Sequence, residues 1–319
     1  MTQASTHPNW GRHHFGYRAN AFMLFVGSRF LWLGYFFVLF AAGWFFVFVP
    51  RARRASIAYL DRLGPNRSLR CRLWDTYRHM LTFGQLLLDR AVLLATDAHG
   101  FAFTSDGLEN IQHSSTPPTG LLLLTAHFGN AEAAAPFLRQ RGLSAPINIV
   151  MYQNAADSTE KFHARHRTRL AGIAIISTIN PLAAGIKIMA ALSRNEVVAL
   201  RADRAMAGKT VAVQFLGQTA HLPAGPFVAA ALSGAPVLSV YTGRTGYKQY
   251  RCIARPPRTY AAGGERNATL RRAAQDFAND LETLVRQYPL QWSNFYDFWA
   301  TTSSNAAATP PAPTESVQP

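Results

Sequence analysis

The sequence predicts an α/β fold, with a mostly parallel or mixed central sheet flanked by helices and a membrane-anchoring helix near the amino terminus. Short apolar, β-rich runs alternate with helical stretches from Gly120 onward, as a parallel sheet covered on both faces requires. One long uncharged segment, at residues 30–49, precedes this alternation. The chain has 319 residues, of which 49% are hydrophobic and 15% charged, and it can therefore bury a sizeable core.

The uncharged segment reads "FLWLGYFFVLFAAGWFFVFV", from Phe30 to Val49. About 20 apolar residues in a helix match the roughly 30 Å hydrocarbon thickness of a bilayer. Pro50 and "RARR" follow it instead of a small-residue cleavage site, so we expect an anchor and not a signal peptide. A helix lying in one leaflet would fit these residues nearly as well. Arginines flank the segment on both sides and are more numerous after it, which favours a cytoplasmic body.

These patterns predict four parts of the chain. They are a basic segment (1–29), a membrane-anchoring helix (30–49), an α/β domain (50–299) and a disordered tail (300–319). The tail contains "TTSSNAAATPPAPTESVQP", which is too polar and too rich in proline to bury enough apolar surface to fold.

The elements of the α/β domain follow from the spacing of apolar residues. An amphipathic helix is expected over 70–94, with its apolar face on the body or on the bilayer. The expected strands are "LLLLTA", "INIVMY", "IAII", "VVALRA", "VAVQFLG", "VLSVY" and "YRCIAR". The expected helices after the first strand lie near 131–141, 158–171, 182–193, 225–234 and 267–287.

The charge of the chain indicates an anionic partner. A net charge of +15 and a pI near 10.5 suit nucleic acid, an anionic membrane or an acidic carrier protein. We expect no nucleic-acid partner, because no binding-module signature is present and basic residues cluster beside the apolar segment. Cys71 and Cys252 stand alone and predict neither a disulfide framework nor a zinc knuckle. A G-x-S-x-G motif is absent from the sequence, which argues against a serine hydrolase of that type.

The first candidate site is the stretch "LLLLTAHFGNAE", which ends at Glu132. It places His127 at the end of the first strand, the edge where open parallel sheets bind ligands. Five helical steps would separate His127 and Glu132 by roughly 140°, so their contact requires a loop at Gly129 before a helix that begins near Asn130. A carboxylate on one imidazole nitrogen would leave the other free to take a proton from a hydroxyl. The same pattern also describes a polar helix cap, and spacing alone does not decide between the two.

The second candidate site is the block "LRADRAMAGKTVAVQFLGQTAHLPAGPFVAAALSGAPVL". A strand ends in Arg201 and Asp203, and the helix predicted over "AGPFVAAALSGAP" offers free backbone N–H groups at its start. Such a place suits an anion or an oxyanion. Alternatively, Asp203 and Arg201 pair with each other at the rim of the sheet.

Taken together, the two blocks and the anchor resemble the lysophospholipid acyltransferase family of the lipid A type, bacterial enzymes that add secondary acyl chains to lipid A precursors. "HFGNAE" is similar to that family's "HFGNWE", and "YPLQWSNFYDFW" (288–299) resembles its "YP-x-Q-W" signature. The second block resembles its "D-Q … G … F-F-G … G-P … A … G-A-P-V" pattern. Two departures stand out: Ala131 replaces the usual Trp, and Arg204 stands where the family often has Gln.

The resemblance implies transfer of an acyl chain from a thioester of acyl carrier protein or coenzyme A to a hydroxyl of a lipid A-like glycolipid. It implies that His127 is the general base and that Glu132 orients and charges it, without a metal or a cofactor. Asp203 is expected to hold an arginine in place. The candidates for oxyanion or substrate binding are Arg167, Arg169, Arg201 and Asp203.

The resemblance also implies a place in the bacterial inner membrane, with the catalytic domain facing the cytoplasm and anionic lipids against the basic flank. Two alternatives stay open. One is an acyltransferase acting on a different membrane lipid or pathway product, which the departures at Ala131 and Arg204 permit. The other is a membrane-anchored lipid-binding protein without catalysis, which would bind glycolipid and never consume the acyl thioester.

Overall fold

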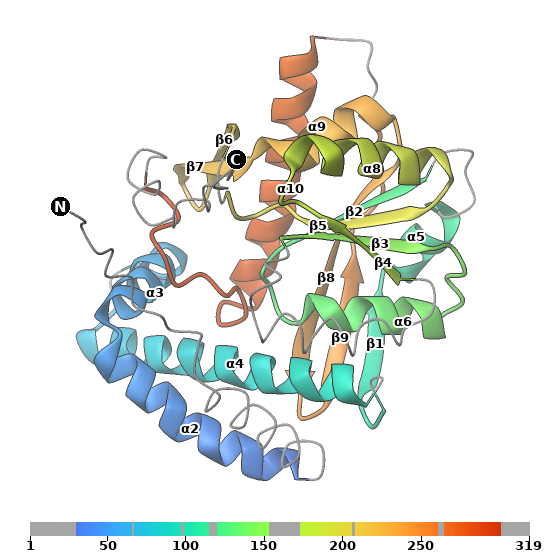
Figure 1. The fold of residues 1–319 in the computed structure, drawn as a ribbon. Helices are drawn as coiled ribbons and strands as arrows, with labels where there is room; N and C mark the ends of the chain where they lie inside the picture. Colours follow the sequence, from blue (N-terminus) through green and yellow to red (C-terminus); the bar gives the residue numbers. More distant parts are fainter. Residues whose placement is uncertain are drawn as a thin grey trace, which may run out of the picture.

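The computed structural model has an α/β body in which helices cover both faces of a seven-stranded sheet (Figure 1). This confirms the predicted fold class. The structure describes residues 30–65, 67–96, 99–114, 120–152, 173–205, 208–260 and 265–300. The predictions that lie outside the described residues are the basic segment 1–29, the helix 158–171, the candidates Arg167 and Arg169, and residues 301–319 of the tail.

The central sheet is mixed, because β8 and β9 are antiparallel while its other neighbouring strands pair in parallel. Its strands are β1 (Ala102–Asp106), β2 (Leu121–Thr125), β3 (Ile147–Met151), β4 (Ile173–Ser177), β5 (Val197–Arg201), β8 (Val237–Gly246) and β9 (Gln249–Ala254). They lie in the order β1-β9-β8-β2-β5-β3-β4. A separate antiparallel hairpin consists of β6 (Thr210–Phe215) and β7 (Gln218–Pro223).

The described helices confirm most of the helical predictions. They are α2 (Leu31–Phe48), α3 (Pro50–Leu63), α4 (Leu69–Ala95), α5 (Leu108–Ser114), the 3₁₀ turn η1 (Ala131–Ala133), α6 (Ala134–Gln140), α8 (Pro181–Ser193), α9 (Ala224–Ser233) and α10 (Arg266–Gln287). Helices α8, α9 and α10 cover one face of the sheet, and α5 and α6 lie on the other (Figure 1). The sequence did not predict β1, β7, α3 or α5 as separate elements.

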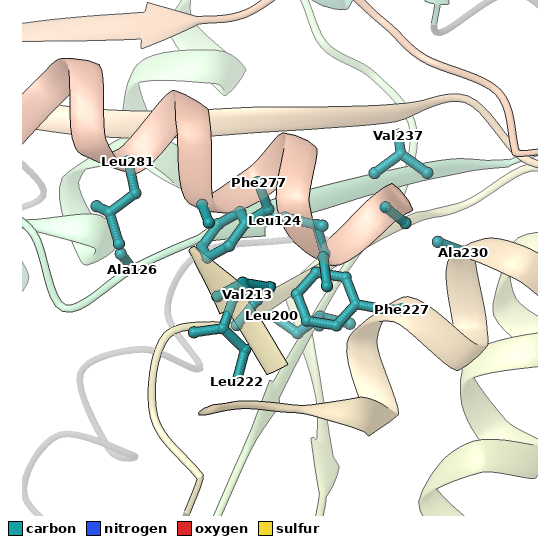
Figure 2. Close-up of a cluster of buried hydrophobic side chains, with 14 of the residues drawn as sticks. Leu124, Ala126, Leu200, Val213, Leu222, Phe227, Ala230, Val237, Phe277 and Leu281 are labelled. Atoms are coloured by element: carbon teal, nitrogen blue, oxygen red, sulfur yellow. The ribbon is translucent and has the colours of Figure 1, made fainter. Parts of the chain in front are cut away.

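Strand β2 shows why the leucine run has no polar residue. Its four leucines are all buried, and they alternate between the two faces of the sheet. Leu122 and Leu124 belong to the core beneath α8, α9 and α10, where Figure 2 shows Leu124 among side chains of α9 and α10. Leu121 and Leu123 pack with Phe137 of α6 on the opposite face. Burying each leucine side chain contributes about 1.5–3 kcal/mol, so β2 is fixed from both sides.

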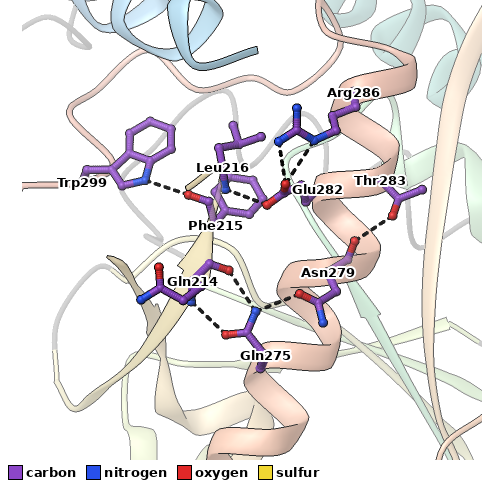
Figure 3. A network of polar contacts seen from close by, with 9 residues as sticks. All are labelled: Gln214, Phe215, Leu216, Gln275, Asn279, Glu282, Thr283, Arg286 and Trp299. Carbon is purple, nitrogen blue, oxygen red and sulfur yellow. Dashed lines mark hydrogen bonds and ion pairs between the residues drawn. The ribbon is translucent and has the colours of Figure 1, made fainter. Parts of the chain in front are cut away.

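The hairpin β6–β7 follows the end of β5 and is held on α10 by polar contacts (Figure 3). The backbone N–H of Gln214 donates to Oε1 of Gln275 at 2.8 Å. The backbone N–H of Leu216 donates to Oε2 of Glu282 at 2.6 Å. Trp299 Nε1 donates to a backbone carbonyl of β6 at 3.4 Å. The hairpin therefore connects the end of β5, α10 and residues 288–299, which we call the carboxyl-terminal block.

Helix α2 is the predicted anchor, and by length and composition it could cross a membrane. It packs on α4 at two glycines: a Cβ on Gly34 would lie 2.6 Å from Leu88, and one on Gly84 would lie 2.7 Å from Val38. The remaining face of α2 is apolar and exposed. Its exposed large side chains are Trp32, Phe36, Phe37, Leu39, Phe40, Trp44, Val47 and Phe48. Only 22% of the helix is buried in the body. Most of its apolar surface is therefore exposed in this structure.

A buried polar cluster ties α2 to the sheet through Asp89 of α4. The Asp89 carboxylate accepts hydrogen bonds from the hydroxyls of Tyr35 of α2 (2.5 Å) and Tyr250 of β9 (2.6 Å). Nε of Arg244, from β8, lies 3.3 Å from the same carboxylate. Burial raises the pKa of Asp89 above its ordinary value, although the two phenols and Arg244 oppose that shift. Four elements thus meet at one carboxylate.

Candidate active site

The loop that carries His127 is held between β8 and the carboxyl-terminal block. The backbone N–H of Gly129 donates to the Gln291 carbonyl at 2.8 Å, and that of Asn130 donates to the Thr242 carbonyl at 2.9 Å. Gly129 has φ +54, and a Cβ there would lie 2.0 Å from the Thr242 carbonyl oxygen. Because both the positive φ and this close approach require glycine, the "HFGN" stretch holds His127 in a fixed loop.

Asp203 holds His127 through both carboxylate oxygens. Strands β2 and β5 pair in parallel with Thr125 opposite Arg201, so the positions two residues further on lie side by side. Oδ1 of Asp203 lies 2.9 Å from Nδ1 of His127, and Oδ2 accepts the His127 backbone N–H at 3.0 Å. An ionised carboxylate requires a proton on Nδ1, which leaves Nε2 as the proton acceptor. None of the described residues hydrogen-bonds Nε2, and the imidazole side chain is 29% exposed.

Asp203 itself is buried, with a side-chain exposure of 3%. Oδ2 accepts a further hydrogen bond from Trp292 Nε1 at 3.0 Å. Burial is the largest single influence and would raise the pKa of Asp203. The charge of the His127 imidazolium and the hydrogen bonds from His127 and Trp292 together outweigh it and hold that pKa well below the ordinary carboxyl range. Asp203 is therefore an anion at neutral pH.

Glu132 lies in the turn η1 and pairs with arginines. Its Oε1 is 2.7 Å from a guanidinium nitrogen of Arg201 and 2.9 Å from one of Arg90. This geometry corrects the expectation that Glu132 orients the imidazole and that Asp203 holds an arginine. A carboxylate forms stronger, charge-assisted hydrogen bonds with guanidinium groups than with a neutral imidazole, and the β2–β5 register already places Asp203 beside His127.

Arg204 links the end of β5 to the carboxyl-terminal block. Its Nη2 donates to the Ser293 carbonyl at 3.1 Å, and its guanidinium lies 4.8 Å from the centre of the Tyr296 ring. The Ser293 backbone N–H in turn donates to the His127 carbonyl at 2.7 Å. The departure from the resembled family at Arg204 thus has a structural role here, since it holds this block against the site.

Helices α3 and α4 reach the site through His79. This buried imidazole contacts Ser56 Oγ with Nδ1 and the Trp292 carbonyl with Nε2, both at 2.8 Å. A carbonyl can only accept, so Nε2 carries the proton and Nδ1 accepts from the Ser56 hydroxyl. Burial lowers the pKa of His79 to about 4, although the bond to the Trp292 carbonyl opposes this shift. His79 is therefore neutral at pH 7.

The structure brings the described candidates together as two pairs, His127 with Asp203 and Glu132 with Arg201. The contributors that sequence reasoning did not single out are Arg90, His79 and Trp292. Trp292 lies within the quoted "YPLQW" signature, which was a usable signal. Arg90 and His79 had none beyond their place on an amphipathic helix. Within the described ranges, no group of three or more His, Cys, Asp or Glu side chains could hold a metal ion.

A partly exposed imidazole with one nitrogen held by a buried carboxylate is the arrangement of a general base. The model of the bacterial lipid A biosynthesis acyltransferase family matches residues 82–301, well over half of the chain. The chain belongs to this family, and its membership makes it an acyltransferase of lipid A biosynthesis with an acyl donor and a lipid acceptor. Among curated proteins, none is significantly similar to this chain.

Proposed function

We propose that this protein transfers a fatty acyl chain from an acyl thioester to a hydroxyl of a lipid A-like membrane glycolipid, with His127 as the general base. The observation that carries the proposal is the state of the imidazole. Asp203 fixes the proton on Nδ1, and Nε2 is left to accept one. The thioester of acyl carrier protein or of coenzyme A is the expected donor.

In the proposed reaction, Nε2 of His127 takes the proton of the acceptor hydroxyl while the hydroxyl oxygen attacks the thioester carbonyl carbon. A C–O bond forms and the carbonyl oxygen becomes an oxyanion. The oxyanion then collapses, the C–S bond breaks, and the imidazolium returns its proton to the leaving thiolate. Asp203 stabilises the imidazolium between these steps because it is an anion buried against Nδ1. The scheme uses no metal and no cofactor.

Arg201 and Arg90 are the proposed donors to the oxyanion or to phosphate groups of the substrates. Both guanidiniums meet at the Glu132 carboxylate, and their side chains are 28% and 23% exposed. Glu132 follows His127 by five residues, and Arg201 precedes Asp203 by two. Glu132 is thus proposed as a positioning residue, since it holds the guanidinium groups of Arg201 and Arg90 at one carboxylate.

The membrane location is proposed from α2 and its flank. The exposed apolar face of α2 suits the hydrocarbon of a bilayer, and α3 begins with Arg51, Arg53 and Arg54, which suit anionic headgroups. Together they would hold the body against the cytoplasmic face of the bacterial inner membrane. A carrier protein or coenzyme A is also anionic and would be attracted by the same charge.

The experiment that tests the proposal uses the full chain in detergent micelles, with an acyl thioester and a lipid A precursor as substrates. Mass spectrometry of the acceptor should find a gain of one acyl group with the wild type. His127→Ala should reduce the rate about 10²- to 10⁴-fold. His221→Ala, in the hairpin strand β7, is the matched control and should retain the wild-type rate.

A His127→Ala variant that acylates at the wild-type rate would contradict the assignment. Acylation of a lysophospholipid in place of the lipid A precursor would show that the acceptor is another membrane lipid. A protein that binds the glycolipid and leaves the thioester unconsumed would contradict acyl transfer itself.

A further inference from the structure

We propose that Trp292 is a positioning residue of the acyl-transfer site, whose indole N–H aims the Asp203 carboxylate at His127, and that His79 of α4 holds Trp292 in place. The inference rests on the proposed function of His127 and Asp203. It adds a connection between the helices that follow the anchor and the general base.

Trp292 contacts Asp203 with its side chain and the loop that carries His127 with its backbone. Its Nε1–H donates to Oδ2 of Asp203 at 3.0 Å, and its backbone forms a β-bridge with Phe128, the residue after His127. The side chain is fully buried, and edge-to-face contacts fix its ring. The ring centroids of Phe298, Tyr59 and Phe215 lie 4.8, 5.0 and 5.3 Å from that of Trp292. The indole thus has one orientation to offer Asp203.

The two oxygens of Asp203 have different donor atoms as partners. The indole can therefore affect the oxygen that faces His127 Nδ1 without contacting His127 itself. Oδ2 accepts from Trp292 Nε1 and from the His127 backbone N–H, whereas Oδ1 faces His127 Nδ1. Because a carboxylate is planar, two donors on Oδ2 set the direction of Oδ1. The indole also draws negative charge toward Oδ2, and it thereby moderates how strongly Oδ1 stabilises the imidazolium.

His79 fixes Trp292 through its backbone carbonyl. The Nε2–H of His79 donates to the Trp292 carbonyl, which sets the tautomer because a carbonyl can only accept, and Ser56 of α3 donates to Nδ1. The His79 ring also stacks on Phe295, with 4.5 Å between the centroids. A chain of hydrogen bonds therefore runs from Ser56 through His79, Trp292 and Asp203 to the imidazole of His127.

The test compares Trp292→Phe with Trp299→Phe in the full chain. Both remove an indole donor from the same block, but Trp299 donates to a carbonyl of β6. We expect Trp292→Phe to lower kcat on the order of tenfold, as for the loss of a charge-assisted hydrogen bond, and to leave KM unchanged. The acidic limb of the pH profile of kcat/KM should move to higher pH. Without the indole N–H, more of the negative charge of Asp203 lies on Oδ1, which favours the imidazolium. Trp299→Phe should keep the wild-type kcat and profile.

Two results with Trp292→Phe would overturn the proposal: values equal to those of Trp299→Phe, or a lower kcat with an unmoved acidic limb, which would indicate packing alone. Proton NMR gives a readout that needs no turnover. The Nδ1–H resonance of His127, identified by its loss in Asp203→Asn, should shift in Trp292→Phe and stay in place in Trp299→Phe. An unchanged resonance in both variants would contradict the proposed geometry.

His79 offers a second pair of variants, which also serves if Trp292→Phe fails to fold. His79→Gln retains an N–H near the Nε2 position, and His79→Leu does not. We expect His79→Gln to recover most of the kcat that His79→Leu loses, and the acidic limb to move in His79→Leu alone. Equal kcat and equal profiles in both variants would overturn the role of His79. An inactive wild type would instead refute the proposed function, so the two failures are distinguishable.

Discussion

His127 and Asp203 are 76 positions apart in sequence, and both oxygens of the Asp203 carboxylate contact His127, at 2.9 and 3.0 Å. The parallel register of β2 and β5 creates this contact, because it sets Thr125 beside Arg201 and both chains continue for two residues in the same direction. The sheet thus positions His127 and Asp203 together.

The buried face of β2 should carry a large share of the stability. Leu124→Ala deletes a side chain that is 1% exposed in the core under α9 and α10. We expect it to lower the free energy of unfolding by about 2–5 kcal/mol. Leu182→Ala removes the same atoms from a side chain that is 77% exposed and should cost little. Denaturant unfolding in one detergent measures both, and equal losses would contradict the described core.

The cluster at Asp89 should stabilise the packing of α4 on strand β9. Tyr250→Phe removes a 2.6 Å hydrogen bond to a carboxylate that is fully buried. We expect a loss of about 1–3 kcal/mol in the free energy of unfolding. Tyr152→Phe, at a side chain that is 57% exposed, is the control. A Tyr250→Phe variant as stable as the control would show that the cluster does not stabilise the fold.

His79 should make stability depend on pH. Its pKa is about 4 in the folded chain and 6.5 for an ordinary imidazole, so between these values the unfolded chain binds a proton that the folded chain does not. Stability is therefore fully present above about pH 6.5 and falls toward pH 4, by about 3 kcal/mol in total. His79→Leu lacks this term. The unfolding free energy of the wild type minus that of His79→Leu should therefore decrease as the pH falls. A difference that stays constant with pH would refute the buried neutral imidazole.

Much of the fold could be predicted because its signals are local. The run from Leu121 to Leu124 indicated a strand buried on both faces, and the spacing of apolar residues indicated α4, α8, α9 and α10. Strand β1 was not predicted because "AFTSD" is mostly exposed and has no clear apolar alternation. Strand β7 was not predicted because it runs directly into α9 at Pro223.

Four members of the candidate site could be identified from the sequence, but the way in which they pair could not. His127, Glu132, Arg201 and Asp203 were all identified from motifs. The carboxylate that contacts the imidazole depends on the β2–β5 register, which no local pattern contains. Likewise, a fold is needed to bring Arg90 of α4 to Glu132.

The most direct test compares Asp203→Asn with Glu132→Gln, each of which neutralises one carboxylate at nearly constant size. The measurement is the pH dependence of kcat/KM for acyl transfer. Asp203 contacts Nδ1 of His127, so Asp203→Asn should lower kcat/KM strongly and move the acidic limb of its pH profile to lower pH. The charge of Glu132 is balanced by two arginines, so Glu132→Gln should lower activity and leave the acidic limb close to that of the wild type. A limb that moves in Glu132→Gln and stays fixed in Asp203→Asn would contradict the account.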